Sequence, residues 1–141
     1  MPSQEIILER LLSKEGLPYV WGGNYSQKLE RWESLYPPPK SLSQVALAHW
    51  SFQGLDCSGL LYEATEGLTP RNTSGLFRYG EKVQKEELRA LDLALYPGHV
   101  MIILNKESLI ESSLEKGGVV ISPIEQRLNE IKDQVTFRRF L

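Results

Sequence analysis

The hydrophobic residues of this chain recur at helical spacing in its first half and form short continuous runs in its second half. An N-terminal helix is predicted after Ser3, which can cap it, and before Gly16 and Pro18, which end it. The apolar face of this helix consists of Ile7, Leu8, Leu11 and Leu12. Such a face predicts packing against a core.

Three further helical segments are predicted. One begins after Asp56, a residue that favours the N-cap position, and runs to about Glu66. A shorter one follows the turn at residues 69–74 and is closed by Gly80. Pro123 can start a last helical turn.

From residue 91 onward, apolar runs of strand length that are rich in β-branched residues replace the helical pattern. The predicted strands are Leu91 to Tyr96, His99 to Leu104, Leu109 to Ser113, Val119 to Ser122 and Val135 to Phe140. The hairpin turns between them contain Asn105-Lys106-Glu107 and Gly117-Gly118. This order predicts an α+β fold in which N-terminal helices pack on a C-terminal antiparallel β-sheet.

Residues 24–53 interrupt the pattern with a polar, irregular stretch that has three consecutive prolines near its centre. We interpret this stretch as a surface insertion in a single domain that covers residues 1–141. Three aromatic residues give the insertion enough apolar mass to dock on the rest of the domain: Trp32, Tyr36 and Trp50.

Composition limits the classes of function. Of the 141 residues, 41% are hydrophobic, which is enough for one globular core. The 16 Lys and Arg against 18 Asp and Glu give a formal net charge of −2 without a basic stripe, which argues against a nucleic-acid partner. No apolar run approaches the roughly 18 residues of a membrane span. The sequence has neither a secretory signal pattern nor a metal-ligand spacing of His and Cys.

Cys57 is the single cysteine of the chain, so it cannot form an internal disulfide. It follows the predicted cap Asp56 and therefore occupies the first turn of a helix. Unpaired backbone N–H groups and the positive end of the helix dipole favour the thiolate there. Cys57 is thus a candidate nucleophile, and the alternative is a small buried hydrophobic residue.

Two histidines could serve as the base of a thiolate enzyme. His49 lies in a short apolar stretch that is typical of a packed or solvent-facing histidine. His99 follows Tyr96-Pro97-Gly98 and opens a core strand, so its ring projects from a rigid element into the space that the turn borders. We therefore predict His99 to be the general base.

Helices that carry a cysteine, followed by a sheet that carries a histidine, are the layout of papain-like proteins. The chain resembles the NlpC family of bacterial cell-wall cysteine peptidases over nearly its whole length outside the insertion. The matching motifs, in order, are Pro18-Tyr19-Val20-Trp21-Gly22-Gly23, Asp56-Cys57-Ser58-Gly59-Leu60, Pro70-Arg71, Leu91-Asp92-Leu93 and Gly98-His99-Val100.

This resemblance implies a catalytic set. Cys57 would be the nucleophile, His99 the base, and Tyr19 a hydroxyl that helps to hold the developing oxyanion. The family usually orients the histidine with a second His, or with Asn or Gln, about a dozen residues further on, whereas this chain has Glu111 there. We predict that Glu111 accepts a hydrogen bond from the ring nitrogen of His99 that does not face Cys57.

The resemblance also implies substrate-binding residues. Asp56 and Ser58 match positions that bind the amino terminus of a short stem peptide, Arg71 borders the same groove, and Trp21 belongs to the upstream motif. Structural roles are the alternatives: a helix cap for Asp56, an ion pair for Arg71, and core packing for Trp21 and Tyr19.

The family's usual reaction is cleavage of the γ-D-glutamyl bond to meso-diaminopimelate or lysine in peptidoglycan stem peptides, without a cofactor. We expect muropeptides as substrates and the bacterial cell envelope (periplasm) as the workplace, if a longer parent chain carries an export signal. Cytoplasmic muropeptide recycling is the alternative. A catalytically weakened peptidoglycan-binding module and a papain-like amidase or acyltransferase are competing functions, and the 24–53 insertion is expected to restrict which peptides enter the groove.

Overall fold

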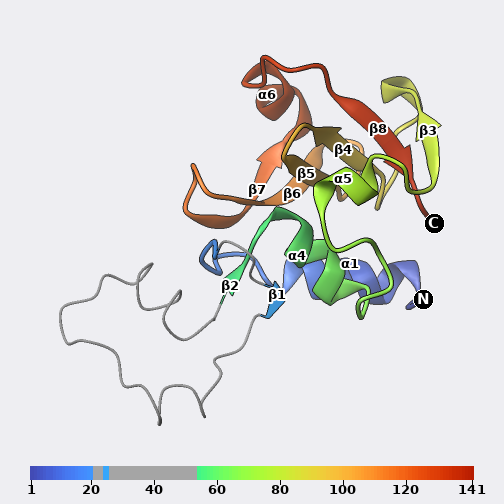
Figure 1. The fold of residues 1–141 in the computed structure, drawn as a ribbon. Coiled ribbons are helices and arrows are strands. Elements are labelled where there is room, and N and C mark those ends of the chain that lie inside the picture. Colours follow the sequence, from blue (N-terminus) through green and yellow to red (C-terminus); the bar gives the residue numbers. More distant parts are fainter. Residues whose placement is uncertain (21–23, 26–53) are drawn as a thin grey trace, which may run out of the picture.

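The computed structural model describes residues 1–20, 24–25 and 54–141. The predictions for Trp21, for His49 and for residues 26–53 of the predicted 24–53 insertion lie outside the described residues. Helices α1 and α4 lie on one side of an antiparallel sheet and α6 lies on the other, as Figure 1 shows. The predicted α+β architecture is confirmed.

The predicted helices and strands occur in the predicted order, together with three short strands that were not predicted. The helices are α1 (Gln4–Leu12), α4 (Cys57–Ala64), α5 (Thr73–Leu76) and α6 (Ile124–Asn129), with a 3-10 turn η1 (Lys85–Glu87). The strands are β1 (Asn24–Tyr25), β2 (Gly54–Leu55), β3 (Glu81–Val83), β4 (Leu93–Tyr96), β5 (His99–Ile103), β6 (Ser108–Ser113), β7 (Gly118–Pro123) and β8 (Thr136–Arg139). Strands β3 to β8 form one sheet in the order β3-β8-β4-β5-β6-β7, and all neighbours are antiparallel.

The side chains of β5 alternate between two apolar clusters. Val100 and Ile102 belong to the cluster that includes the buried residues of α1 and α4. Met101 and Ile103 belong to the second cluster, which α6 covers through Ile124. His99 is in phase with Met101 and Ile103, so it lies on the α6 face at the end of the strand.

Polar side chains begin the two long helices as predicted. The Ser3 hydroxyl accepts a hydrogen bond from the backbone N–H of Ile6, and the Asp56 carboxylate accepts one from Gly59 at 2.6 Å. Because nearly every residue of α4 is buried, this helix forms the centre of the packing between α1 and the sheet. The cap therefore fixes Cys57 at a defined point at the helix start.

Helix α4 ends at Ala64, earlier than the predicted Glu66. The backbone of Glu66 has a φ of 57° and that of Gly67 a φ of 78°, which cannot continue a right-handed helix. The N–H of Gly67 donates to the carbonyl of Tyr62, and that of Glu66 donates to Glu63. These two bonds form a Schellman motif with Glu66 in the left-handed position.

Strands β1 and β2 were not predicted. Asn24 pairs with Leu55 and Tyr25 pairs with Gly54, so chain positions on the two sides of residues 26–53 lie next to each other, just before Asp56. Within the described residues, no helix has the length and apolar character needed to cross a membrane.

Candidate active site

Cys57 opens helix α4 at the floor of a cleft of about 770 Å³. Its side chain is largely buried, with 7% of the residue exposed. The sulfur lies 3.6 Å from the hydroxyl of Thr73, the first residue of α5, and 3.7 Å from the carbonyl of Gly98. Helix, short helix and strand turn thus surround the thiol on three sides.

The surroundings of Cys57 favour its ionised form. Burial opposes the thiolate, but hydrogen bonds with His99 and Thr73, together with the charge of His99, lower the pKa of Cys57 below its usual value. The predicted lowering of the Cys57 pKa therefore has a physical basis in one ionisable group, His99, and two neutral groups, the Thr73 hydroxyl and the backbone of Val100.

His99 begins β5 directly after the Pro97-Gly98 turn, where Gly98 has a φ of 85°. The ring of Tyr96, which pairs with His99 across the strands, lies against the imidazole with centroids 5.2 Å apart. His99 Nε2 is 2.9 Å from Glu111 Oε1. Burial disfavours the imidazolium, yet hydrogen bonds to Cys57 and Glu111 raise the pKa of His99 to about 8.

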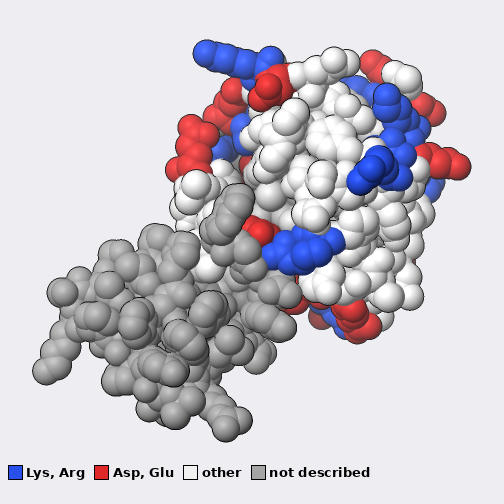
Figure 2. Space-filling view, viewed as in Figure 1, with Lys and Arg blue, Asp and Glu red and all other residues white. Residues whose placement is uncertain are grey.

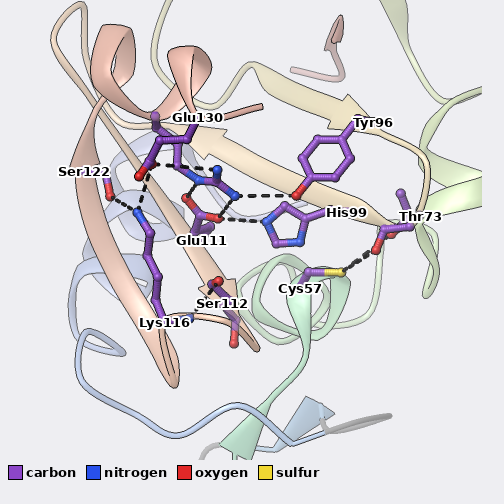
Figure 3. Close-up of polar contacts among 12 residues, drawn as sticks. Cys57, Thr73, Tyr96, His99, Glu111, Ser112, Lys116, Ser122 and Glu130 are labelled. Atoms are coloured by element: carbon purple, nitrogen blue, oxygen red, sulfur yellow. Dashed lines mark hydrogen bonds and ion pairs between the residues drawn. The ribbon is translucent and has the colours of Figure 1, made fainter. Parts of the chain in front are cut away.

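Glu111 lies on β6 and is fully buried. Ile102 pairs with Ile110, so Glu111 lies beside the Met101 position, two residues along β5 from His99 and on the same face of the sheet. The predicted contact between Glu111 and His99 is confirmed (Figure 3). It forms diagonally across the two strands.

A second group also holds the Glu111 carboxylate. Arg127 of α6 donates from Nε to Oε2 at 2.7 Å and from Nη2 to Oε1 at 3.0 Å. Burial disfavours ionisation of Glu111, but hydrogen bonds from His99 and Arg127 lower its pKa. Glu111 is therefore a carboxylate, able to accept from the imidazole.

Tyr19 is a buried neighbour of Cys57 and lines the same cleft. Its backbone N–H donates to the carbonyl of Gly117, which anchors the segment to the end of β6 and β7. Burial, with the charges of Cys57 and Asp56, raises the pKa of Tyr19 to about 12, while Arg71 opposes this shift. Tyr19 thus keeps its proton and remains a hydrogen-bond donor at neutral pH.

Asp56, Ser58 and Arg71 form one network on the wall of the cleft. The Arg71 guanidinium donates to both carboxylate oxygens of Asp56 at 3.1 Å and to the Ser58 hydroxyl at 3.0 Å. Ser58 in turn donates to the Arg71 carbonyl at 2.7 Å. The alternatives given above, an ion pair for Arg71 and a helix cap for Asp56, are confirmed, and their contact with a peptide stays a prediction.

Two residues of the site were not found by sequence reasoning. Thr73 stands at the first position of α5, and Arg127 stands three residues after Ile124 on the buried side of α6. The available signal for Arg127 was its position on an otherwise apolar helix face, paired with Glu111 on an apolar strand. No comparable signal marks Thr73.

The visible surface carries no single dominant charge. On the face shown in Figure 2, uncharged side chains cover most of the described surface, and basic groups alternate with acidic ones around its edge. A second cleft of about 390 Å³ shares Tyr19, Pro97 and Gly98 with the first. Cys57 lines the first cleft, and His99 lines the second.

Residues 16–138 match the model of the NlpC/P60 family. The chain belongs to the NlpC/P60 family. It is 33% identical over 129 residues to peptidoglycan endopeptidase RipB of Mycobacterium tuberculosis, a match that covers 86% of this chain and 48% of RipB. Peptidoglycan endopeptidase RipA of the same organism is 26% identical over 117 residues, covering 78% of this chain and 22% of RipA. The chain therefore spans about half the length of RipB and less of RipA.

Solved structures show the same papain-like fold. The structure of the peptidoglycan hydrolase RipB aligns with a TM-score of 0.69 at 28% identity, covering 98% of this chain and 64% of that one. The P60 domain of the M. avium subspecies paratuberculosis antigen MAP1204 gives a TM-score of 0.66 at 27% identity, covering 96% and 93%. RipD of M. tuberculosis, described as a non-catalytic NlpC/p60 domain protein, gives 0.68 at 22% identity, covering 100% and 99%.

Proposed function

We propose that this protein is a peptidoglycan hydrolase, a cysteine endopeptidase that cleaves the γ-D-glutamyl bond to diaminopimelate or lysine in stem peptides. One observation carries the proposal. The Cys57 thiol, whose pKa is lowered, is hydrogen-bonded to the His99 imidazole, which in turn contacts the buried Glu111 carboxylate. The likeness to two proteins named peptidoglycan endopeptidases supports the choice of substrate.

The first chemical step is attack by the Cys57 thiolate on the carbonyl carbon of the γ-D-glutamyl bond. The electron pair of the carbonyl moves onto its oxygen, and the protonated Tyr19 hydroxyl donates to that oxygen. His99 carries the proton at this stage, because its pKa of about 8 keeps it imidazolium at neutral pH. Glu111 stabilises this charge.

Collapse of the intermediate breaks the carbon–nitrogen bond. The imidazolium of His99 gives its proton to the leaving amine, which departs as the diamino acid fragment, and a thioester remains on Cys57. Neutral His99 then takes a proton from water, and the hydroxide oxygen attacks the thioester carbonyl. The acid product leaves, and the thiolate and imidazolium are restored.

Thr73 supports the first step from the other side of the sulfur. Its hydroxyl is within 3.6 Å of Cys57 Sγ and can donate to the thiolate without adding charge. We assign to Thr73 the stabilisation of the resting thiolate, since it is one of the groups that lower the pKa of Cys57.

The network of Asp56, Ser58 and Arg71 is the proposed contact for the amino-terminal end of the peptide. These side chains line the same cleft as Cys57, and Asp56 is the acidic member that would attract an ammonium group. Arg71 keeps the carboxylate oriented by its paired hydrogen bonds. We place the reaction in the bacterial cell envelope, with cytoplasmic turnover of free muropeptides as the other setting.

The test is incubation of the purified chain with L-Ala-γ-D-Glu-meso-diaminopimelate and its lysine counterpart, read by mass spectrometry. We expect the dipeptide L-Ala-D-Glu, with its γ-carboxyl group free, and the free diamino acid to accumulate, and Cys57→Ala to stop this. Binding of the peptides without products would instead identify a peptidoglycan-binding module. Cleavage only of other amides would identify a different papain-like amidase.

A further inference from the structure

Arg127 is a buried cation that the mechanism above does not use. Only 5% of the residue is exposed, and it lies three residues after Ile124 on the side of α6 that packs on the sheet. Burying a guanidinium is unfavourable unless it is paired and hydrogen-bonded. Its placement against Glu111 therefore calls for a role in the site.

The contacts of Arg127 fix the plane of the Glu111 carboxylate. Nε and Nη2 donate to the two oxygens at 2.7 and 3.0 Å, which is the paired geometry that a guanidinium forms with a carboxylate. Oε1 serves two partners, because it accepts from Arg127 Nη2 and also lies 2.9 Å from His99 Nε2. The position of Arg127 thus decides which lone pair of Oε1 is directed at His99.

Other charged and titratable groups surround this pair at the edges. Arg127 Nη2 lies 3.5 Å from the Tyr96 hydroxyl, and Nη1 lies 3.8 Å from Glu130, whose side chain is 44% exposed and which also contacts Lys116. Glu115 and Tyr19 line the second cleft together with His99 and Arg127. Among the described residues, the basic side chain that forms an ion pair with Glu111 is Arg127.

We propose that Arg127 is the positioning residue of this site: it orients Glu111 so that His99 stays directed at Cys57, and its charge sets the pH range in which the thiolate and imidazolium coexist. This inference rests on the proposed cysteine hydrolase function. It adds a fourth member to the set, so that the charges alternate along Cys57, His99, Glu111 and Arg127. The hydrolytic step itself is unchanged.

The test uses the full chain with two readouts. Alkylation of Cys57 by iodoacetamide across pH reports the thiolate without any substrate, and kcat and KM are measured on the tripeptide above. For Arg127→Met we expect kcat to fall at least about tenfold with KM within about twofold, because the contacts act on the reacting groups. Removing a nearby positive charge raises the pKa of each group that titrates, so the alkylation onset should move to higher pH by on the order of one unit.

A lysine variant separates orientation from charge. Arg127→Lys keeps the positive charge but loses the paired hydrogen bonds. We expect the alkylation onset to stay within about 0.3 pH units of the wild type while kcat remains several-fold reduced. A fully restored kcat would overturn the orienting role, and an onset displaced as far as in Arg127→Met would overturn the role of charge.

A double variant keeps the test valid if Arg127→Met alone does not fold. Glu111→Gln combined with Arg127→Met removes both buried charges together, which leaves no uncompensated carboxylate. Because Arg127 acts through Glu111, adding Arg127→Met to Glu111→Gln should change kcat by no more than about twofold. A further tenfold loss would mean that Arg127 acts by another route and would overturn the proposal.

Arg139→Met is the matched control. Arg139 donates to both oxygens of the buried Asp92 at 2.8 and 2.7 Å, but Asp92 lies at the end of the β4–β5 hairpin opposite His99. We expect a lower melting temperature and an unchanged alkylation profile. A profile that shifts as in Arg127→Met would show a general effect of lost stability and would overturn the inference.

The two proposals fail separately. If the wild type leaves the tripeptide intact while Arg127→Met shifts the alkylation onset, the substrate assignment falls and the role of Arg127 stands. If the wild type cleaves the tripeptide while Arg127→Met changes neither kcat nor the alkylation profile, the role of Arg127 falls and the hydrolase assignment stands.

Discussion

The helical side of the site and the sheet side hold their reactive groups by different forces. Around Cys57, the partners other than His99 are uncharged: the Thr73 hydroxyl at 3.6 Å, the Gly98 carbonyl at 3.7 Å and the backbone of Val100. The partner of His99 on the sheet side is the buried Glu111 carboxylate at 2.9 Å. This carboxylate is itself bound by the Arg127 guanidinium at 2.7 Å. Hydrogen bonds between sulfur and uncharged groups at these distances are weaker than the short bonds between two ionised groups inside a protein.

This difference separates two tasks. The helical side fixes where the sulfur stands, because the Asp56 cap and the buried helix α4 define its position. The sheet side contributes most to ionising the sulfur, because it supplies the imidazolium and the carboxylate that stabilises it, while the Thr73 hydroxyl adds a smaller effect. Substitutions on the two sides should therefore differ in size and in their effect on the pH profile.

Cys57→Ala should have the largest effect on activity. It removes the nucleophile, so hydrolysis of the stem peptide should fall by at least about 10⁴-fold. The protein should stay folded, since the change deletes one sulfur atom at the cleft floor. Mass spectrometry of the products and a thermal melt measure the two results. Residual turnover above about one per cent would exclude Cys57 as the nucleophile.

Glu111→Gln should follow, with a roughly 10²-fold loss of kcat, because an amide carries no charge to stabilise the imidazolium of His99. The sign of the pH effect is definite. A neighbouring carboxylate raises the pKa of His99, so its loss lowers that pKa from about 8, and the alkaline limb of the rate should move to lower pH. A pH–rate profile measures this shift.

The outcome that contradicts the role of Glu111 is an unchanged alkaline limb with full turnover. Glu115→Gln is a suitable comparison, because Glu115 lines the same cleft as His99 but is exposed to solvent. Its alkaline limb should match that of the wild type.

Thr73→Val tests the weaker, helical side. The isosteric change removes one hydrogen bond to sulfur, which is worth about 0.5 to 1.5 kcal/mol, so kcat/KM at neutral pH should fall about two- to tenfold. Because the Thr73 hydroxyl lowers the pKa of Cys57, the alkylation onset should move to higher pH while the alkaline limb stays in place. Thr73→Ser should restore the wild-type profile. A shifted alkaline limb would show that the two sides are not separate.

Arg71→Met should have the smallest effect on the chemistry. The ion pair with Asp56 is partly exposed, with 32% of the arginine side chain accessible, so its loss should cost below about 1 kcal/mol in unfolding free energy. We expect KM for the tripeptide to rise several-fold and kcat to change less than about twofold. A large fall in kcat with unchanged KM would contradict the proposed role of Arg71 in peptide binding and would indicate a role in catalysis.

Sequence patterns predicted the central strands well because continuous apolar runs of strand length reflect burial on both faces of the sheet. Strands β4, β5, β6 and β7 lie at the predicted runs. Strand β3 was missed because it contains Glu81 and Lys82 and only one apolar residue. It forms at the sheet edge through pairing with β8, where Glu81 lies opposite Arg139, and such tertiary pairing leaves no local pattern.

The same limit applies to the site. Cys57 and His99 follow from motifs, and the Glu111 contact followed from the hairpin arrangement of two adjacent strands. Arg127 reaches Glu111 only because α6 folds back over the sheet. Thr73 reaches Cys57 only because the fold brings the first residue of α5 to the start of α4, 16 residues away along the chain. Contacts between elements that are not neighbours in the sheet require the tertiary packing to be known.

The pairing of β1 with β2 has a consequence for how this fold can vary. The two strands bring positions 24–25 and 54–55 together, and β2 leads directly into Asp56 and Cys57. The backbone pairing of residues 24–25 with residues 54–55 therefore holds the start of α4 in place. This pairing can form with a connecting segment of a different length. Closing a loop of twice the length costs only about 0.6 kcal/mol more. The β1–β2 pair is thus a place where evolution or an engineer can exchange segments of different length while the nucleophile keeps its position.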